Sequence, residues 1–172
     1  MASHLVVTAS PHLKAPASTP VIMWTVVASL LPIVAASLYF FGVSALLVIA
    51  ASLLGAIAAE AAFGGRQTIG DGSGVITGIL LGLTLPAGLP LWMAFVGGMV
   101  SIALGKRIFG GLGCNIFNPA LLGRAFMMAA FPVPLTTWPA PAASLWTLAG
   151  DNFALPLMTP DAAAMITAAT PL

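Results

Sequence analysis

Two apolar stretches of 21 residues each, separated by a single glycine, constrain the fold of this chain more than any other feature. Val21–Phe41 contains no charged residue, and Val43–Phe63 contains one, Glu60. At 1.5 Å per residue such a helix is about 31 Å long, which matches a hydrocarbon core of roughly 30 Å. Only 5% of the 172 residues are charged, whereas soluble domains carry about 25%. We therefore predict an integral membrane protein with an all-α, polytopic transmembrane helix bundle.

Two shorter apolar segments follow a polar loop, Gly64–Gly74, that carries Arg66 and Asp71. Gly74–Pro86 extends about 20 Å as a helix and Leu89–Gly105 about 25 Å, so neither spans comfortably. They form either two thin spans or one re-entrant hairpin, and both arrangements return the chain to its starting side. Short hydrophobic segments interrupted by Gly and Pro point to a binding region in membrane proteins.

Residues 105–126 are the stretch in which a site should be sought. They combine three of the chain's five cations with three glycines in four residues and two asparagines. Glycines let the backbone take positive φ or approach a ligand closely. Asn118 followed by Pro119 predicts the start of a short helix that runs to Phe131 and carries Arg124 inward. Irregular backbone at membrane depth persists only where protein or a cavity satisfies it.

Two further residues carry expectations that a structure can test. Glu60 lies in the last turn of its span and is expected to reach the membrane interface, with a buried role as the alternative. Cys114 is the single cysteine, so it excludes an internal disulfide. It is expected to be a small buried hydrophobe, although a cluster shared with a partner subunit stays open.

The distribution of cations predicts the topology. One face of the membrane receives Lys14, Arg66, Lys106 and Arg107, and the opposite loops contain no Lys or Arg. This positive-inside bias places the N-terminus in the cytoplasm. The chain then divides into a cytoplasmic segment (1–20), a transmembrane bundle (21–131) and an extracytoplasmic, interfacial loop rich in proline (132–172). No basic cluster is present, so no nucleic-acid partner is expected.

Several motifs carry a resemblance to a known family. They are Ser10-Pro11-His12, Ser18 to Met23, Asp71-Gly72-Ser73-Gly74-Val75-Ile76-Thr77-Gly78, Leu83-Thr84-Leu85-Pro86, Gly105 to Phe126, and Ala169-Thr170-Pro171-Leu172. On these residues the chain resembles the N-terminal half of the RnfD/NqrB family, and most of all the D subunit of the Rnf ion-translocating oxidoreductase complex.

The resemblance implies half of a bundle of about ten helices in two related halves, within a complex that passes electrons between ferredoxin and NAD while moving Na⁺ or H⁺. It also implies FMN esterified through its phosphate to a threonine of a Ser/Thr-Gly-Ala-Thr motif. Here that motif reads Thr167-Ala168-Ala169-Thr170, so Thr170 matches the modified position, while Ala168 departs from the family glycine.

The leading hypothesis is therefore a membrane flavoprotein subunit in the prokaryotic cytoplasmic membrane. Its expected partners are lipid, the other Rnf-type subunits and a second half of similar size, and a second, noncovalent flavin is possible by the same resemblance. Four polar residues are expected to line a cofactor site, with helix caps or packing bonds as their alternative roles: Asp71, Asn115, Asn118 and Arg124. Arg124 suits a phosphate or an acidic partner such as Glu60. The rival hypotheses are a passive channel or solute transporter subunit with re-entrant helices and a purely structural subunit.

Overall fold

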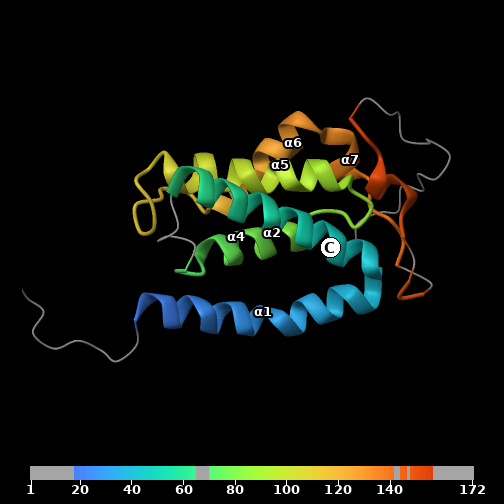
Figure 1. The fold of residues 1–172 in the computed structure, drawn as a ribbon. Helices are drawn as coiled ribbons and strands as arrows, with labels where there is room; N and C mark the ends of the chain where they lie inside the picture. The colour runs from blue at the N-terminus through green and yellow to red at the C-terminus, as the bar shows by residue number, and fades with distance from the viewer. Residues whose placement is uncertain (1–17, 65–69, 142–143, 147, 157–172) are drawn as a thin grey trace, which may run out of the picture.

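The computed structural model describes residues 18–64, 70–141, 144–146 and 148–156, and these residues form helices and loops without a strand (Figure 1). The all-α bundle predicted from the sequence is thus confirmed. In chain order the elements are α1 (Thr19–Phe41), α2 (Val43–Gly64), α4 (Ser73–Leu83), α5 (Leu91–Ile102), the π-helical turn η1 (Ala103–Arg107), α6 (Pro119–Ala130), α7 (Pro132–Thr136) and the 3₁₀ turn η2 (Gly150–Phe153).

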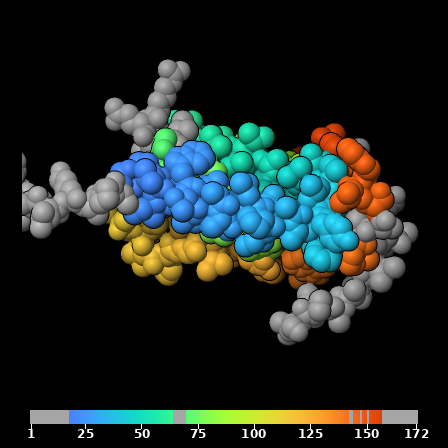
Figure 2. Space-filling view, turned by 90° about the horizontal axis from the view of Figure 1, so that it is seen from below, coloured from blue at the N-terminus to red at the C-terminus, as the bar shows by residue number. Residues whose placement is uncertain are grey.

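Helices α1 and α2 are the two described helices long and apolar enough to cross a membrane, as predicted. Helix α1 lies lengthwise across one face of the bundle, with its outer side uncovered (Figure 2). Leu30 is the one buried residue of this helix. Many of its exposed side chains are large and apolar, among them Leu31, Ile33 and Phe40. Such a surface suits lipid or further helices, because it would be costly to leave in water.

Helices α4 and α5 form a hairpin that packs against α2 (Figure 1). Small residues let the backbones approach closely, as expected for helices in lipid. A Cβ at Gly55 of α2 would overlap the Phe95 carbonyl of α5, and one at Gly98 of α5 would overlap the Ser52 carbonyl of α2. The Ser52 hydroxyl in turn donates to the Gly78 carbonyl of α4 at 3.0 Å.

The main apolar core lies where α2, α4, α5 and α6 meet. It contains Val48, Leu81, Leu85, Leu89, Ala94, Ala120, Met127 and Leu135. Three of these, Leu81, Ala94 and Met127, have no exposed surface. The core fixes α6 against α5 and therefore sets the position of the loop that precedes α6.

The two ends of the bundle gather different segments. At one end, Trp24 Nε1 of α1 donates to the Gly70 carbonyl at 3.4 Å, and Lys106 Nζ lies 3.5 Å from Asp71 Oδ2. At the other end, Val43 N donates to the Leu145 carbonyl at 2.9 Å. The chain therefore returns to its starting end after α5, as predicted from the lengths of its segments.

The turn between α4 and α5, residues 84–90, is largely buried although it is not helical. A Cβ at Gly88 would contact Ala149 and Pro139 at 3.8 and 3.9 Å. The segment after α6 thus covers this turn. Irregular backbone is satisfied here by protein, which is the condition that a membrane setting imposes.

Candidate functional site

The centre of the candidate site is a buried ion pair between Lys106 and Glu60. Lys106 Nζ donates to Glu60 Oε1, and the two side chains are 3% and 2% exposed. Lys106 also donates to the Ser73 hydroxyl and lies 3.5 Å from Asp71 Oδ2. Asp71 Oδ1 accepts from the backbone N–H and the hydroxyl of Ser73 at 2.9 and 2.7 Å. The end of α2, the start of α4 and the more distant turn η1 therefore meet at one ammonium group.

The backbone around this cluster is shaped to admit the charged groups. A Cβ at Gly74 would overlap Glu60 Oε2, so only glycine leaves room for the carboxylate at the first turn of α4. Lys106 projects from the π-helical turn η1. π-helical turns are uncommon in proteins, and those that occur are often found at functional sites.

The loop after η1 has the glycine geometry expected from the sequence. Gly110, Gly111 and Gly113 have φ of 102°, 107° and 88°, which L-residues with a side chain rarely adopt. Asn118 then caps α6, its side chain accepting from Ala120 N at 3.0 Å, with Pro119 at the first helical position. The predicted helix start is confirmed.

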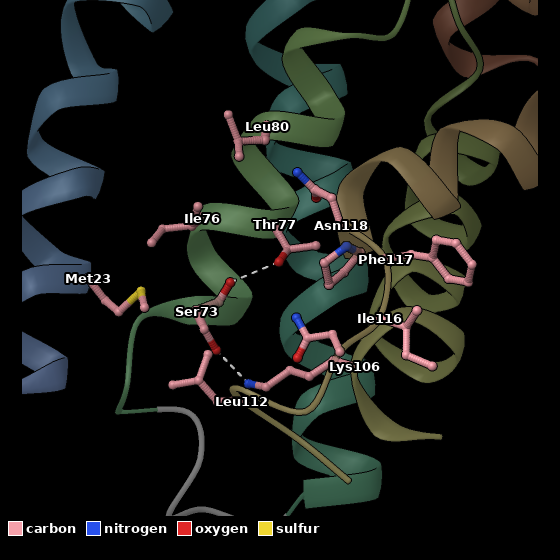
Figure 3. Close-up of a pocket in the computed structure, with 12 residues that line it drawn as sticks. Met23, Ser73, Ile76, Thr77, Leu80, Lys106, Leu112, Ile116, Phe117 and Asn118 are labelled. Atoms are coloured by element: carbon pink, nitrogen blue, oxygen red, sulfur yellow. Dashed lines mark hydrogen bonds between the residues drawn. The ribbon is translucent and has the colours of Figure 1, made fainter. Parts of the chain in front are cut away.

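A pocket of about 390 Å³ opens beside the ion pair. Lys106 points to Ser73 at its base, and Thr77 donates to the Ser73 carbonyl at 2.9 Å (Figure 3). Its other lining residues come from α1, α4, the loop before α6 and the first residue of α6: Met23, Ile76, Leu80, Leu112, Asn115, Ile116, Phe117, Asn118 and Pro119. The pocket thus has apolar walls and a polar base with one charged group.

Asn115 is a polar residue of the pocket with a buried group that is unused. Its Oδ1 atom is buried and has no hydrogen-bond partner within the described part of the chain. A buried acceptor without a partner costs free energy. It is therefore a position at which a donor group of a bound molecule would be stabilised.

The structure brings together three of the four residues that the sequence nominated. Asn115 and Asn118 line the pocket. Asp71 does not line it, but its Oδ2 atom lies 3.5 Å from Nζ of Lys106 at the base of the pocket. Arg124 lies elsewhere: it donates to the carbonyl of Thr84, the residue that ends α4. Glu60, the acidic partner suggested for Arg124 as an alternative to a phosphate, pairs with Lys106 instead.

Two expectations from the sequence are wrong. Glu60 does not reach the interface, since it is 1% exposed; the ammonium of Lys106 compensates its charge inside the bundle. Cys114 is exposed, not buried, because it follows the turn of positive-φ glycines that leads away from the packed helices. Thr170, Thr167 and Arg66 lie outside the described residues.

Lys106 and Ser73 are the site residues that sequence reasoning missed. The sequence groups Lys106 with Arg107 at a charged membrane edge, yet Lys106 is 2% exposed. One signal could have found it: an acid within a neighbouring apolar span needs a counter-ion if it is buried, and a lysine at the end of an apolar segment can supply one. Glu60 is that acid.

The chain matches the NQR2, RnfD, RnfE family over residues 6–172. It is 41% identical over 138 residues to the D subunit of the Na(+)-translocating ferredoxin:NAD(+) oxidoreductase complex of Acetobacterium woodii, a match that covers 78% of this chain and 43% of the relative. It is 40% identical over 136 residues to the D subunit of the proton-translocating ferredoxin:NAD(+) oxidoreductase complex of Clostridium ljungdahlii, covering 77% and 41%. It is also similar to the D subunit of the ion-translocating oxidoreductase complex of Methanosarcina acetivorans, at 42% identity over 125 residues, covering 70% and 43%. The chain thus spans about two fifths of the length of these curated relatives.

Proposed function

Since this chain belongs to the NQR2, RnfD, RnfE family, we propose that it is a membrane flavoprotein subunit of an ion-translocating electron-transport complex. The complex couples redox chemistry between ferredoxin and NAD to the movement of Na⁺ or H⁺. The family match over residues 6–172 carries this proposal, together with relatives that are named as D subunits of such complexes. Its partners are the other subunits of the complex and a second half that corresponds to the rest of those relatives.

A flavin supplies the electron transfer in this proposal, because the side chains of the chain do not carry electrons and a cofactor does. Thr170 holds FMN covalently through a phosphoester. It occupies the modified position of the family's motif, and Pro171 favours an extended conformation in the residue before it. Small residues, Ala168 and Ala169, leave the hydroxyl accessible to a modifying enzyme.

A second flavin binds without a covalent bond in the pocket beside Lys106. About 390 Å³ lies within the usual range of roughly 300–1,000 Å³ for small-molecule sites. A flavin ring has an apolar benzenoid side and a pyrimidine edge with N–H and C=O groups. The pocket offers apolar walls, the buried acceptor Oδ1 of Asn115 and the positive charge of Lys106, whose own hydrogen bonds go to Glu60, Ser73 and Asp71. The residues present therefore fit such a ring.

The proposed orientation places the N-terminus in the cytoplasm of a prokaryote and the loop from Pro132 outside. The arrangement of segments supports it, because Lys106 and the start of α1 share one end of the bundle while Leu145 lies at the other. Thr170 follows that outer segment in sequence. The family resemblance implies that exported flavin transferases attach the FMN. They would meet Thr170 on the outer side of the membrane.

A passive channel or solute transporter subunit is the alternative, and a purely structural subunit is a third. A visible absorption spectrum of the purified complex separates these functions from a flavoprotein. Mass spectrometry of the C-terminal peptide then locates the covalent flavin, in cells that also express the transferase. We expect the mass of FMN on the wild-type and Thr167→Val peptides and its absence from Thr170→Val. An unmodified wild-type peptide, or a modified Thr170→Val peptide, would contradict the assignment.

A further inference from the structure

We propose that Lys106 is the group that raises the reduction potential of a flavin bound in the adjacent pocket, and that Glu60, Asp71 and Ser73 hold its ammonium there. This inference rests on the proposed function, since it takes the pocket to be the noncovalent flavin site. It goes beyond that function by assigning an electrostatic role to one lysine and positioning roles to its three partners.

The first step is the placement of the charge. Lys106 lines the pocket, yet its side chain is only 3% exposed. Among the residues that line the pocket it is the one with an ionisable side chain. A charge that is shielded from water acts on its neighbours far more strongly than one in solvent.

The second step is how the ammonium is held. Glu60 and Ser73 accept hydrogen bonds from Lys106, and Asp71 Oδ2 lies 3.5 Å away. Glu60 is itself buried, and the missing Cβ at Gly74 makes space for its carboxylate. Since an ammonium has three donor hydrogens, this arrangement fixes Nζ at the base of the pocket and prevents the side chain from extending into solvent.

The third step is the effect on a flavin. Reduction increases the negative charge on the pyrimidine side of the ring. A fixed positive charge nearby therefore stabilises the reduced form more than the oxidised form, and the midpoint potential rises. The two carboxylates oppose this effect. Glu60 and Lys106 should consequently shift the potential in opposite directions, which a purely structural role would not do.

The test compares two variants of the assembled complex, Glu60→Gln and the double variant Glu60→Gln, Lys106→Met. Both lack the Glu60 charge, so neither leaves that buried carboxylate without its counter-ion, and they differ only in the ammonium. A Thr170→Val background removes the covalent flavin from this chain, and flavins of other subunits are common to both variants. Spectroelectrochemical titration then gives the midpoint of the noncovalent flavin.

We expect the midpoint to be higher in Glu60→Gln than in wild type, and lower in the double variant than in Glu60→Gln. The matched control adds Arg107→Met to Glu60→Gln, which removes a cation that does not line the pocket, and we expect a smaller shift. Equal midpoints in Glu60→Gln and the double variant would overturn the role of Lys106 while leaving the flavin site intact. Acid extraction of the wild-type complex provides the separate check. Absence of extractable flavin attributable to this chain would overturn the flavin site itself, and with it this inference.

Discussion

Lys106 and Glu60, 46 residues apart in sequence, form an ion pair inside the helix bundle, with side chains that are 3% and 2% exposed. Burying two charges carries a desolvation cost that their attraction does not reliably offset. The pair is therefore weak evidence for a stabilising role. Its position at the base of the pocket of about 390 Å³ gives it a functional interpretation instead.

The buried ion pair predicts how single and double variants of Lys106 and Glu60 change the free energy of unfolding. Lys106→Met leaves Glu60 buried without its counter-ion, which typically costs about 3–5 kcal/mol. The double variant Glu60→Gln, Lys106→Met removes both charges and should recover most of that loss. Thermal unfolding of the purified complex in detergent measures both. A double variant no more stable than Lys106→Met alone would show that the two side chains are not coupled.

Gly74 provides a second, purely steric test of the same site. A Cβ there would overlap Glu60 Oε2, whereas one at Gly70 would meet nothing within 4 Å. Gly74→Ala should displace the carboxylate and destabilise the complex by about 1–3 kcal/mol, the usual cost of overpacking. Gly70→Ala is the matched control and should have little effect. Equal melting temperatures for the two variants would contradict the close approach of Glu60 to Gly74.

Local sequence patterns predict the features of this chain that depend on local chemistry. The lengths of α1 and α2 follow from runs of apolar residues, and the start of α6 follows from Asn118 and Pro119, because capping involves residues close in sequence. The return of the chain to its starting end follows from counting segments. The close packing of α2 against α5 agrees with the small residues of α2.

The rest depends on pairings between distant segments, which no local pattern encodes. Glu60 lies in the last turn of an apolar span, so its local sequence predicts an acid at the membrane interface. Its partner Lys106 lies two helices further along the chain, so the local sequence does not reveal the pairing. Lys106 lies beside Arg107 at the end of an apolar segment, so its local sequence predicts a cation at the membrane interface. The π-helical turn from which it projects inward has no sequence signature. Arg124 was expected in the cofactor site, whereas it reaches the carbonyl of Thr84; a guanidinium can satisfy any nearby acceptor, and the sequence does not rank them.

Arg124 therefore gives a third prediction. Its guanidinium donates to Thr84 at the end of α4, where helix carbonyls lack intrahelical partners and the helix dipole favours a cation. Arg124→Ala should destabilise the turn after α4 by about 1–3 kcal/mol and lower electron transfer in the assembled complex. Arg66→Ala, in the segment that precedes α4, is the comparison and should barely change either. Equal melting temperatures and equal rates for the two variants would contradict this role of Arg124.

Variants of Asn118 and Asn115 distinguish a role in helix capping from a role in ligand binding. Asn118→Ala removes the acceptor for Ala120 N and should cost about 0.5–2 kcal/mol, while Asn118→Ser preserves a cap. Asn115→Ala should instead reduce the noncovalent flavin retained by the complex, because Asn115 Oδ1 is the unused acceptor of the pocket. Melting temperatures and acid-extractable flavin are measured on all three. Equal flavin content in Asn115→Ala and wild type would exclude Asn115 as a flavin contact.

The topology can be tested with the native cysteine. Cys114 is exposed and follows η1, so it lies at the end of the bundle that also holds the start of α1. The positive-inside bias predicts that this end faces the cytoplasm. A membrane-impermeant thiol reagent should therefore label Cys114 in inverted vesicles and not in intact cells.

The variant Cys114→Ser, Trp146→Cys moves the thiol to the opposite end. Trp146 is 83% exposed, and its neighbour Leu145 accepts from Val43 N at the start of α2. This variant should be labelled in intact cells and protected in inverted vesicles. The two thiols should be labelled from opposite sides of the membrane, because they lie at opposite ends of α2. Labelling of both from one side would show that the described bundle does not cross the membrane. Labelling of Cys114 from outside and of residue 146 from inside would reverse the proposed orientation, and Thr170 would then lie on the wrong side for an exported transferase.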